Sequence, residues 1–296
     1  MTLHLLAPAK LNLTLEVLGK RDDGYHEVSS IMQTIDLCDR VRLSLASDLQ
    51  LIVTGPEASG VPEEPAQDLA YRAAVALQKT AGISLGARIE VEKQIPAGAG
   101  LGGGSSDAAA VLRGLYELWD VEVSFSEFVE LAATLGSDVP FFLDGGTQAV
   151  GGRGEELTPL PDAAGPRDFT LFTSPLTVPD KTRRMYGALR LADFSDGERT
   201  AMMTAAVWRG EPVSELCNAF DHAVAEVFPA IGAAMQRCRN AAVHVIAAGA
   251  GRSFFAPVAF DLVPPKLVQS LLADYGITAH TCSALSSADA LAVTED

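Results

Sequence analysis

The sequence predicts a mixed fold of helices and strands that is divided into two lobes. The chain has 296 residues, close to the size at which a single hydrophobic core stops growing, and 48% of them are hydrophobic. Segments with the two-residue period of strands are interspersed with segments that have the period of helices. The segment PDAAGPRD at residues 161–168 is the best candidate for a boundary. We therefore expect an N-terminal lobe of residues 1–160 and a C-terminal lobe of residues 161–296.

The first predicted strand is KLNLTLEV at residues 10–17, where apolar and polar residues alternate strictly. The apolar face carries Leu11, Leu13, Leu15 and Val17, and the polar face carries Lys10, Asn12, Thr14 and Glu16. For Thr14 and Glu16 we expect the solvent-exposed side of an antiparallel strand. Lys10 and Asn12 place a cation beside an amide, and both are candidates for function.

A polar hairpin turn is predicted at residues 19–26, GKRDDGYH. It ends in Tyr25 and His26, which are either ordinary packing groups or a pair that holds a flat ring by stacking and hydrogen bonding. The elements expected next are strands at residues 41–45 and 48–53 that pair with each other, a surface loop at 55–67, a helix that begins near Leu69, and a strand at 87–93.

A glycine-rich loop, PAGAGLGGGSSD at residues 96–107, leads directly into an amphipathic helix. Glycine permits positive φ and lets a backbone approach another group closely, and a helix N-terminus offers unpaired N–H groups to an anion. A flexible turn is the alternative, but five glycines, two serines and an immediate helix favour a phosphate cradle. The candidate residues are Pro96, Gly98, Gly100, Leu101, Gly102, Gly103, Gly104, Ser105 and Ser106, with one of the two serines as the helix N-cap.

Asp138 stands in a short connection after a predicted helix around residues 125–133, which Gly136 closes. The commonest role of such an aspartate is to cap the next helix. A carboxylate beside Phe141 and Phe142 is alternatively a partly desolvated general base that a nearby cation keeps ionised. The spacing is compatible with both roles.

The second half of the chain also mixes strands and helices. The predicted elements are a hairpin at residues 144–157, a strand at 169–173, a helix that follows 178–182, a helical pair around Pro229, a strand–turn–strand unit at 243–258, a helix near 267–273 and a strand near 277–282.

The formal net charge is −16, which argues against nucleic acids and anionic membranes as partners because both require clustered cations. A phosphorylated ligand would be bound by backbone N–H groups, one or two placed cations and Mg²⁺. The start MTLHLLAPAK lacks the regions of a signal peptide, and no window resembles a membrane span, so we expect a cytosolic protein. The widely spaced Cys38, Cys217, Cys238 and Cys282 favour reduced thiols over a zinc site or disulfides.

Three separated segments resemble the motifs of the GHMP kinases, which are ATP-dependent kinases of small molecules. They are PAKLNL at residues 8–13, IPAGAGLGGGSSDAA at 95–109 and GAG at 249–251. Residues 8–28 and 136–155 resemble, more narrowly, the members that phosphorylate a cytidylylated methylerythritol. The resemblance implies an α+β, two-lobed GHMP kinase fold, with an N-terminal lobe like ribosomal protein S5 domain 2, a ferredoxin-like C-terminal lobe and the phosphate loop between them.

The resemblance also implies roles. The γ-phosphoryl group of ATP would be transferred, with Mg²⁺ as cofactor, to the 2-hydroxyl of 4-(cytidine-5′-diphospho)-2-C-methyl-D-erythritol. This reaction belongs to the non-mevalonate route to isoprenoids. Asp138 would accept the hydroxyl proton, Lys10 would keep Asp138 ionised, and Asn12 would orient the polyol. Tyr25 and His26 match the cytidine-recognising pair, and Thr182 matches a threonine near the substrate. No residue is assigned as a metal ligand, and we expect a monomer or a homodimer.

The chain departs from this family in its second half. Arg252 and Ser253 follow the GAG segment, where serine or glycine and then proline are usual, and NAFD at residues 218–221 replaces the more usual NDLE. Two other functions remain as alternatives. One is a homoserine or mevalonate kinase, which would lack the cytidine pair, and the other is a non-catalytic sensor, which would not need Lys10 and Asp138.

Overall fold

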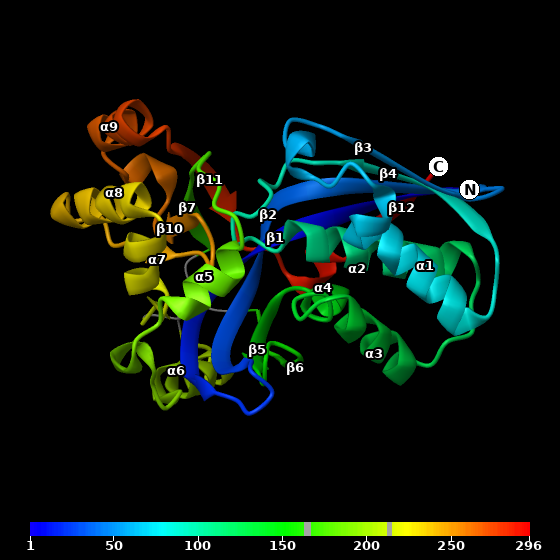
Figure 1. Cartoon of the computed structure of the whole chain (residues 1–296), viewed down its shortest axis with the longest axis horizontal. Coiled ribbons are helices and arrows are strands. Elements are labelled where there is room, and N and C mark those ends of the chain that lie inside the picture. The colour runs from blue at the N-terminus through cyan, green and yellow to red at the C-terminus, as the bar shows by residue number, and fades with distance from the viewer. Residues whose placement is uncertain (163–166, 212–214) are drawn as a thin grey trace.

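Two β-sheets and the helices around them make up the protein. The computed structural model describes residues 1–162, 167–211 and 215–296. Two long strands, β1 (Thr2–Lys20) and β2 (His26–Ala46), pass between a group of helices that includes α1 to α3 and a second group that includes α5 to α9 (Figure 1). The predicted boundary at residues 161–168 lies partly outside the described residues, and the division at residue 160 stays a prediction.

The larger sheet has eight strands in the order β12-β1-β2-β4-β3, with β5 on β2, β6 on β5 and β8 on β1. The further strands are β3 (Leu49–Thr54), β4 (Gly86–Glu92), β5 (Thr147–Gly151), β6 (Glu156–Pro159), β8 (Cys217–Asn218) and β12 (Val293–Glu295). The prediction that residues 48–53 pair with residues 41–45 is wrong, because β3 pairs with β4 in parallel. Strand β4 pairs with residues 41–45 of β2 instead, with Val41 opposite Val91.

Four helices belong to the first half of the chain: α1 (Leu69–Ala81), α2 (Gly103–Leu118), α3 (Phe125–Leu135) and α4 (Phe141–Asp144). Their apolar side chains pack with those of β1, β2 and β4 in one hydrophobic cluster. The side chain of Asp68 caps α1, and Ser124 and Glu127 form a capping box at the start of α3. These helices agree with the predicted segments. Short 3₁₀ turns at Ala58–Gly60 and Pro65–Gln67 lie in the predicted surface loop.

The polar face of β1 is buried, contrary to what we expected for Thr14 and Glu16, which are 0% and 4% exposed. Helix α6 (Glu198–Trp208) packs against β1 and β2 and covers this face. The Thr200 backbone N–H donates to Glu16 Oε2 at 2.7 Å, and the Thr200 hydroxyl donates to Thr14 Oγ1 at 2.9 Å. A helix that the sequence did not reveal thus provides polar partners for what was expected to be a solvated surface.

The smaller sheet has the antiparallel order β11-β7-β10-β9 and belongs to the second half. Its strands are β7 (Asp168–Thr173), β9 (Ile246–Ala247), β10 (Ser253–Ala256) and β11 (Thr278–Ser283). The neighbouring helices are α5 (Lys181–Gly187), α7 (Asp221–Val227), α8 (Pro229–Asn240) and α9 (Pro265–Tyr275), followed by α10 (Ser287–Ala290), with 3₁₀ turns at Leu191–Asp193 and Phe260–Leu262. Four predictions are confirmed: the strand–turn–strand unit at 243–258, the helical pair around Pro229, the helix near 267–273 and the strand near 277–282.

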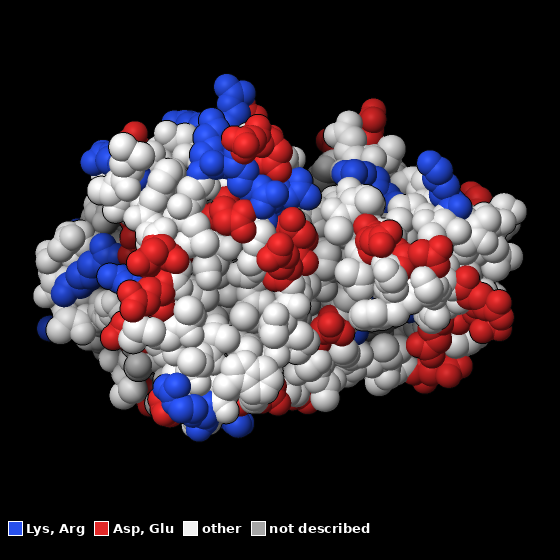
Figure 2. All heavy atoms as spheres, turned by 90° about the horizontal axis from the view of Figure 1, so that it is seen from below, with Lys and Arg blue, Asp and Glu red and all other residues white. Residues whose placement is uncertain are grey.

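On the face seen in Figure 2, Lys and Arg side chains gather mainly in one group near the upper edge, and Asp and Glu side chains lie beside that group and along the right edge. In residues 1–162, 167–211 and 215–296, no helix is both long and apolar enough to cross a membrane. All four cysteines are free, as predicted.

Candidate active site

The three motifs, at residues 8–13, 95–109 and 249–251, meet at one place although they are far apart in the sequence. The backbone N–H of Lys10 donates to the carbonyl of Leu101 at 2.9 Å, and that of Asn12 donates to the carbonyl of Ala248 at 3.3 Å. A Cβ added to Gly249 would lie 2.9 Å from the carbonyl oxygen of Gly100 and 3.1 Å from Lys10 Nζ. The absence of a side chain at residue 249 therefore lets the loop and the lysine come together.

The phosphate loop, residues 96–106, presents a row of backbone N–H groups. Gly98, Gly100 and Gly102 have φ values of 71°, 89° and 76°, the left-handed region that favours glycine. Within the described parts of the chain, the N–H groups of residues 100–105 donate to no other residue. Helix α2 begins at Gly103 with Gly102 as its N-cap, so the prediction that Ser105 or Ser106 caps it is wrong. Because no side chain caps the helix, its first N–H groups remain available to an anion.

Lys10 and Asn12 are both buried and lie side by side. Lys10 Nζ donates to Asn12 Oδ1 at 2.5 Å, and Asn12 Nδ2 donates to the Ser30 hydroxyl at 2.8 Å. Burial lowers the pKa of Lys10, while the negative charge of Asp138 acts in the opposite direction. The ammonium group is thus held in a fixed place where an anion would stabilise its charge.

Asp138 does not cap the following helix. The N-cap of α4 is Pro140, without a side-chain cap. Among the described residues, the Asp138 carboxylate makes no hydrogen bond or ion pair within 4.0 Å, yet its charge acts on Lys10, Lys181 and Tyr186. Of the two roles that the sequence left open, the local capping role has no support in this geometry.

A cavity of about 1260 Å³ brings the predicted residues together. Lys10, Asn12 and Asp138 line it together with Tyr25, His26, Thr182 and the loop residues Pro96, Gly98, Gly100, Leu101, Gly102, Gly103, Gly104 and Ser105. Ser106 does not line the cavity. It is 1% exposed, and its hydroxyl has no partner among the described residues.

Comparison with known proteins places the chain in a family. A model of the GHMP kinases N terminal domain matches residues 68–146. The 4-diphosphocytidyl-2-C-methyl-D-erythritol kinase of Symbiobacterium thermophilum is 41% identical over 262 residues, which cover 87% of this chain and 89% of that protein. The chain belongs to the 4-diphosphocytidyl-2-C-methyl-D-erythritol kinase family. The kinase of the same name from Dehalococcoides mccartyi is 38% identical over 97% of this chain and 100% of its own length.

Solved structures agree with this membership. A crystal structure of a 4-(cytidine 5′-diphospho)-2C-methyl-D-erythritol kinase matches with a TM-score of 0.74 and 36% identity, over 95% of this chain and 99% of that one. A homoserine kinase from Cytophaga hutchinsonii matches with a TM-score of 0.70 over 99% and 97% of the two chains, but at 16% identity. The second likeness shows the α+β fold that GHMP kinases share, as predicted.

In this member of the 4-diphosphocytidyl-2-C-methyl-D-erythritol kinase family, Tyr25 and His26 both line the cavity. The His26 ring stacks on Tyr186 with a centroid distance of 4.8 Å, whereas Tyr25 is 54% exposed with the Arg153 guanidinium 4.8 Å from its ring centre. Burial and the charge of Lys20 both lower the pKa of His26, which favours the neutral imidazole. An uncharged ring that can both donate and accept suits recognition of a heterocyclic base.

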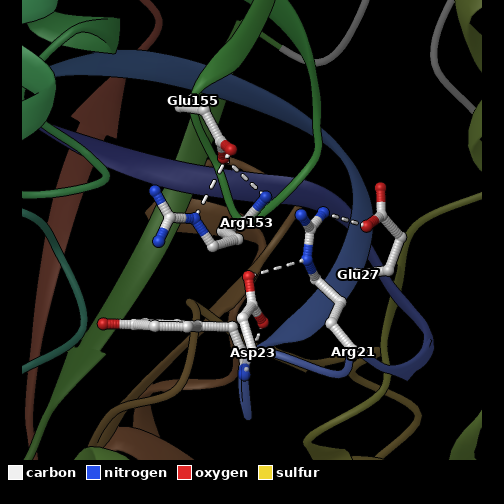
Figure 3. A network of polar contacts seen from close by, with 6 residues as sticks. Arg21, Asp23, Glu27, Arg153 and Glu155 are labelled. Atoms are coloured by element: carbon white, nitrogen blue, oxygen red, sulfur yellow. Dashed lines mark hydrogen bonds and ion pairs between the residues drawn. The ribbon is translucent and has the colours of Figure 1, made fainter.

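Ion pairs hold the turn that carries Tyr25. Arg21 binds Asp23 and Glu27, while Arg153 lies beside Glu155 on the neighbouring β5–β6 turn (Figure 3). The Tyr25 backbone N–H donates to Asp23 Oδ1 at 3.0 Å. The ion pairs of Arg21 join residues within the predicted hairpin turn. The Arg153 guanidinium over the Tyr25 ring brings the second turn against it.

Two groups of charged residues at the site were not predicted. At the base of the loop, Lys93 Nζ donates to the buried carboxylates of Asp39 and Asp107, and the backbone N–H groups of Gln94 and Ile95 donate to Asp39. Burial raises the pKa of Asp107 to about 8, against the opposing charge of Lys93. A signal existed in the sequence, because Lys93 and Asp107 flank the glycine loop on both sides.

The second group is Lys181 and Arg252, which contact the loop from the second half of the chain. Lys181 Nζ donates to the carbonyl of Gly98 at 3.2 Å, and Arg252 Nη2 donates to that of Ala97 at 2.9 Å. Arg252 stands where the sequence departs from the family pattern, and that departure was the available signal, whereas Lys181 directly precedes the predicted Thr182.

Proposed function

We propose that the protein transfers the γ-phosphoryl group of ATP to the 2-hydroxyl of 4-(cytidine-5′-diphospho)-2-C-methyl-D-erythritol, giving the 2-phosphate and ADP, as a step in isoprenoid precursor synthesis. The observation that carries the proposal is the shared cavity. It joins the glycine-rich loop, the ammonium group of Lys10, the carboxylate of Asp138 and the aromatic pair Tyr25 and His26. The names of the relatives, at about 40% identity, support the choice of substrate.

Asp138 is the general base and Lys10 the cation in this reaction. As the acceptor hydroxyl attacks the γ-phosphorus, its proton passes to the Asp138 carboxylate, and the bond between that phosphorus and the β–γ bridging oxygen breaks to release ADP. Lys10 stabilises the negative charge on the attacking oxygen, and the Asp138 carboxylate in turn stabilises the buried ammonium group of Lys10. Asn12 fixes the ammonium group of Lys10 and orients the polyol.

The ATP phosphates bind to the N–H groups of residues 100–105, at the start of α2. The residues present also fit a Mg²⁺ ion. Oδ1 of the buried Asp107 has no hydrogen-bond partner in the described part of the chain, and Asp107 lines the cavity beside the loop. Residues 1–162, 167–211 and 215–296 contain no cluster of three or more potential metal ligands, so the nucleotide phosphates would hold the ion together with Asp107. When bound, the ion neutralises phosphate charge.

Tyr25 and His26 recognise the cytosine ring, and Thr182 lies nearer the reacting end of the substrate. Tyr25 offers an exposed aromatic face, while His26 is fixed by its stack on Tyr186. These residues line the same cavity as Asp138, which supports recognition and chemistry within one continuous space.

The proposal is tested by measuring ATP consumption with the cytidylylated methylerythritol, homoserine and mevalonate in parallel. We expect turnover with the first substrate and little with the other two. Phosphorylation of homoserine or mevalonate alone would assign the protein to another GHMP activity. Nucleotide binding without turnover of any of the three would favour a sensor.

A further inference from the structure

Lys181 is a cation of the cavity that the reaction described above does not use. It is the first residue of α5, is half-buried, and lines the cavity together with Lys10 and Asp138. Its ammonium group has three N–H donors, of which one binds the Gly98 carbonyl at 3.2 Å. Among the described residues, no carboxylate forms an ion pair with it within 4.0 Å. Two donors therefore remain at the edge of the phosphate loop.

The surroundings of Lys181 contain more positive than negative charge. The pKa of Lys181 is lowered to about 8, chiefly by burial, with the charges of Lys10 and Arg252 acting in the same direction and that of Asp138 opposing them. Lys181 thus has two neighbouring cations and one neighbouring carboxylate, in a protein whose net charge is −16. Such crowding costs stability unless an anion joins the group, because like charges repel at short range in a partly buried site.

Arg252 is a second cation at this part of the loop, although it does not line the cavity. It is 8% exposed, its Nη2 holds the Ala97 carbonyl, and its Nε is buried without a partner among the described residues. Arg252 and Lys181 therefore bind the consecutive carbonyls of Ala97 and Gly98, at the end of the loop that comes before its free N–H groups. Both cations lie on the side of the loop that faces the second half of the chain.

We propose that Lys181 binds the γ-phosphate of ATP and stabilises the charge that develops on this group during transfer. The carbonyl of Gly98 holds the ammonium group beside the loop, and the two remaining N–H donors reach the phosphate oxygens. This inference rests on the proposed function and deepens it, since it assigns to the second half of the chain a direct contact with the transferred group. Lys10 then acts at the acceptor oxygen and Lys181 at the phosphoryl oxygens.

The competing explanation is that Lys181 only fastens α5 to the loop. Glutamine at residue 181 retains a donor for the Gly98 carbonyl but has no charge, whereas arginine retains the charge. We therefore compare Lys181→Gln and Lys181→Arg with the wild-type protein. Arg184→Gln is the matched control, because Arg184 lies on the same short helix, is exposed and does not line the cavity.

The measurement is calorimetric binding of AMPPNP and of ADP, each with MgCl₂. It needs no acceptor, so its result is independent of whether the acceptor has been identified correctly. We expect Lys181→Gln to weaken AMPPNP binding roughly 10-fold or more and ADP binding less than about 2-fold, the difference typical of losing a charge-assisted hydrogen bond to the third phosphate. Lys181→Arg and Arg184→Gln should bind both nucleotides like the wild type. Equal weakening of both nucleotides, or of neither, by Lys181→Gln would overturn the proposal.

A second readout is the pH dependence of AMPPNP binding. The groups that face Lys181 are Lys10, Arg252 and Asp138. Because the pKa of Lys181 lies near 8, its charge is lost as pH rises through that value, and AMPPNP affinity of the wild type should fall between pH 7 and pH 9. In Lys181→Arg this fall should be absent. The same fall in both proteins would assign it to Lys10 and contradict the proposal.

Discussion

At the scale of single residues, the site depends on the opposite charges of Lys10 and Asp138. The first comes from the middle of β1 and the second from the connection between α3 and α4, yet both line one cavity. Burying an ammonium group costs free energy, and a nearby carboxylate offsets part of that cost. The pattern around residue 138 left capping and catalysis open, because a cap and a base need the same residue type.

The base role of Asp138 predicts that Asp138→Asn binds ATP with an affinity within about 3-fold of the wild type but loses turnover by roughly 10²–10⁴-fold, the usual contribution of a positioned base. The asparagine has nearly the same shape and cannot accept the proton. Steady-state kinetics and nucleotide binding measure the two effects. Asp144→Asn is the control, since Asp144 is exposed and does not line the cavity. Near-normal turnover of Asp138→Asn would remove this residue from the base role.

At the scale of elements, the phosphate loop is held from two sides. Asp39 and Lys93 bind its entrance, and the turn between β9 and β10 lies against its backbone. A Cβ at Gly251 would lie 2.2 Å from the carbonyl oxygen of Ala99. Glycine at residue 251 is therefore required by a close approach of two backbones, and not only by the flexibility of a turn.

We expect Gly251→Ala to displace the loop, because the clash is with backbone atoms that cannot rotate away. The expected result is a rise of about 10-fold or more in KM for ATP, together with a loss of about 1–3 kcal/mol in stability, as is typical of overpacking. Kinetics and thermal unfolding measure these changes. Gly19→Ala is the control, as a Cβ there meets nothing within 4 Å. If the two variants have the same KM for ATP and the same stability, the close approach of the two backbones is not needed for function.

Elements with strong local patterns were predicted, and those that depend on distant partners were not. Helices α1, α3 and α9 have clear apolar stripes and agree with their predicted segments. By contrast, β8 and β12 have two and three residues and exist only because β1 offers edges to pair with. Helix α6 carries many alanines and threonines, so its apolar stripe is weak. The sequence therefore did not predict this helix or the burial of Thr14 and Glu16 beneath it.

At the scale of the whole molecule, the two halves of the chain share one sheet. Residues 217–218 and 293–295 pair with β1, although both segments come from the predicted C-terminal lobe. Residues 1–160 alone would lack these pairings and the cover that α6 provides. The motifs of the site were recognisable from the sequence, but the contacts of Lys181 and Arg252 with the loop were not, since they join segments more than 80 residues apart.

This sharing predicts that the protein unfolds in one cooperative transition. Differential scanning calorimetry should give a calorimetric enthalpy equal to the van't Hoff enthalpy, since two of the three hydrophobic clusters contain side chains from both halves of the chain. Expression of residues 1–160 alone serves as the companion experiment and should yield no cooperative transition. Two separate transitions in the full chain would show that the lobes are independent and would contradict this expectation.

The course of β1 has a consequence for genetic experiments on this protein. Along its 19 residues, side chains enter three hydrophobic clusters in turn: Leu5 in the first, Leu11 in another, and Val17 in the third. Lys10 lies between these contacts, so its position depends on packing throughout the molecule. A random-mutagenesis screen for inactive variants should therefore return core positions from both halves of the chain, many of them far from any bound substrate.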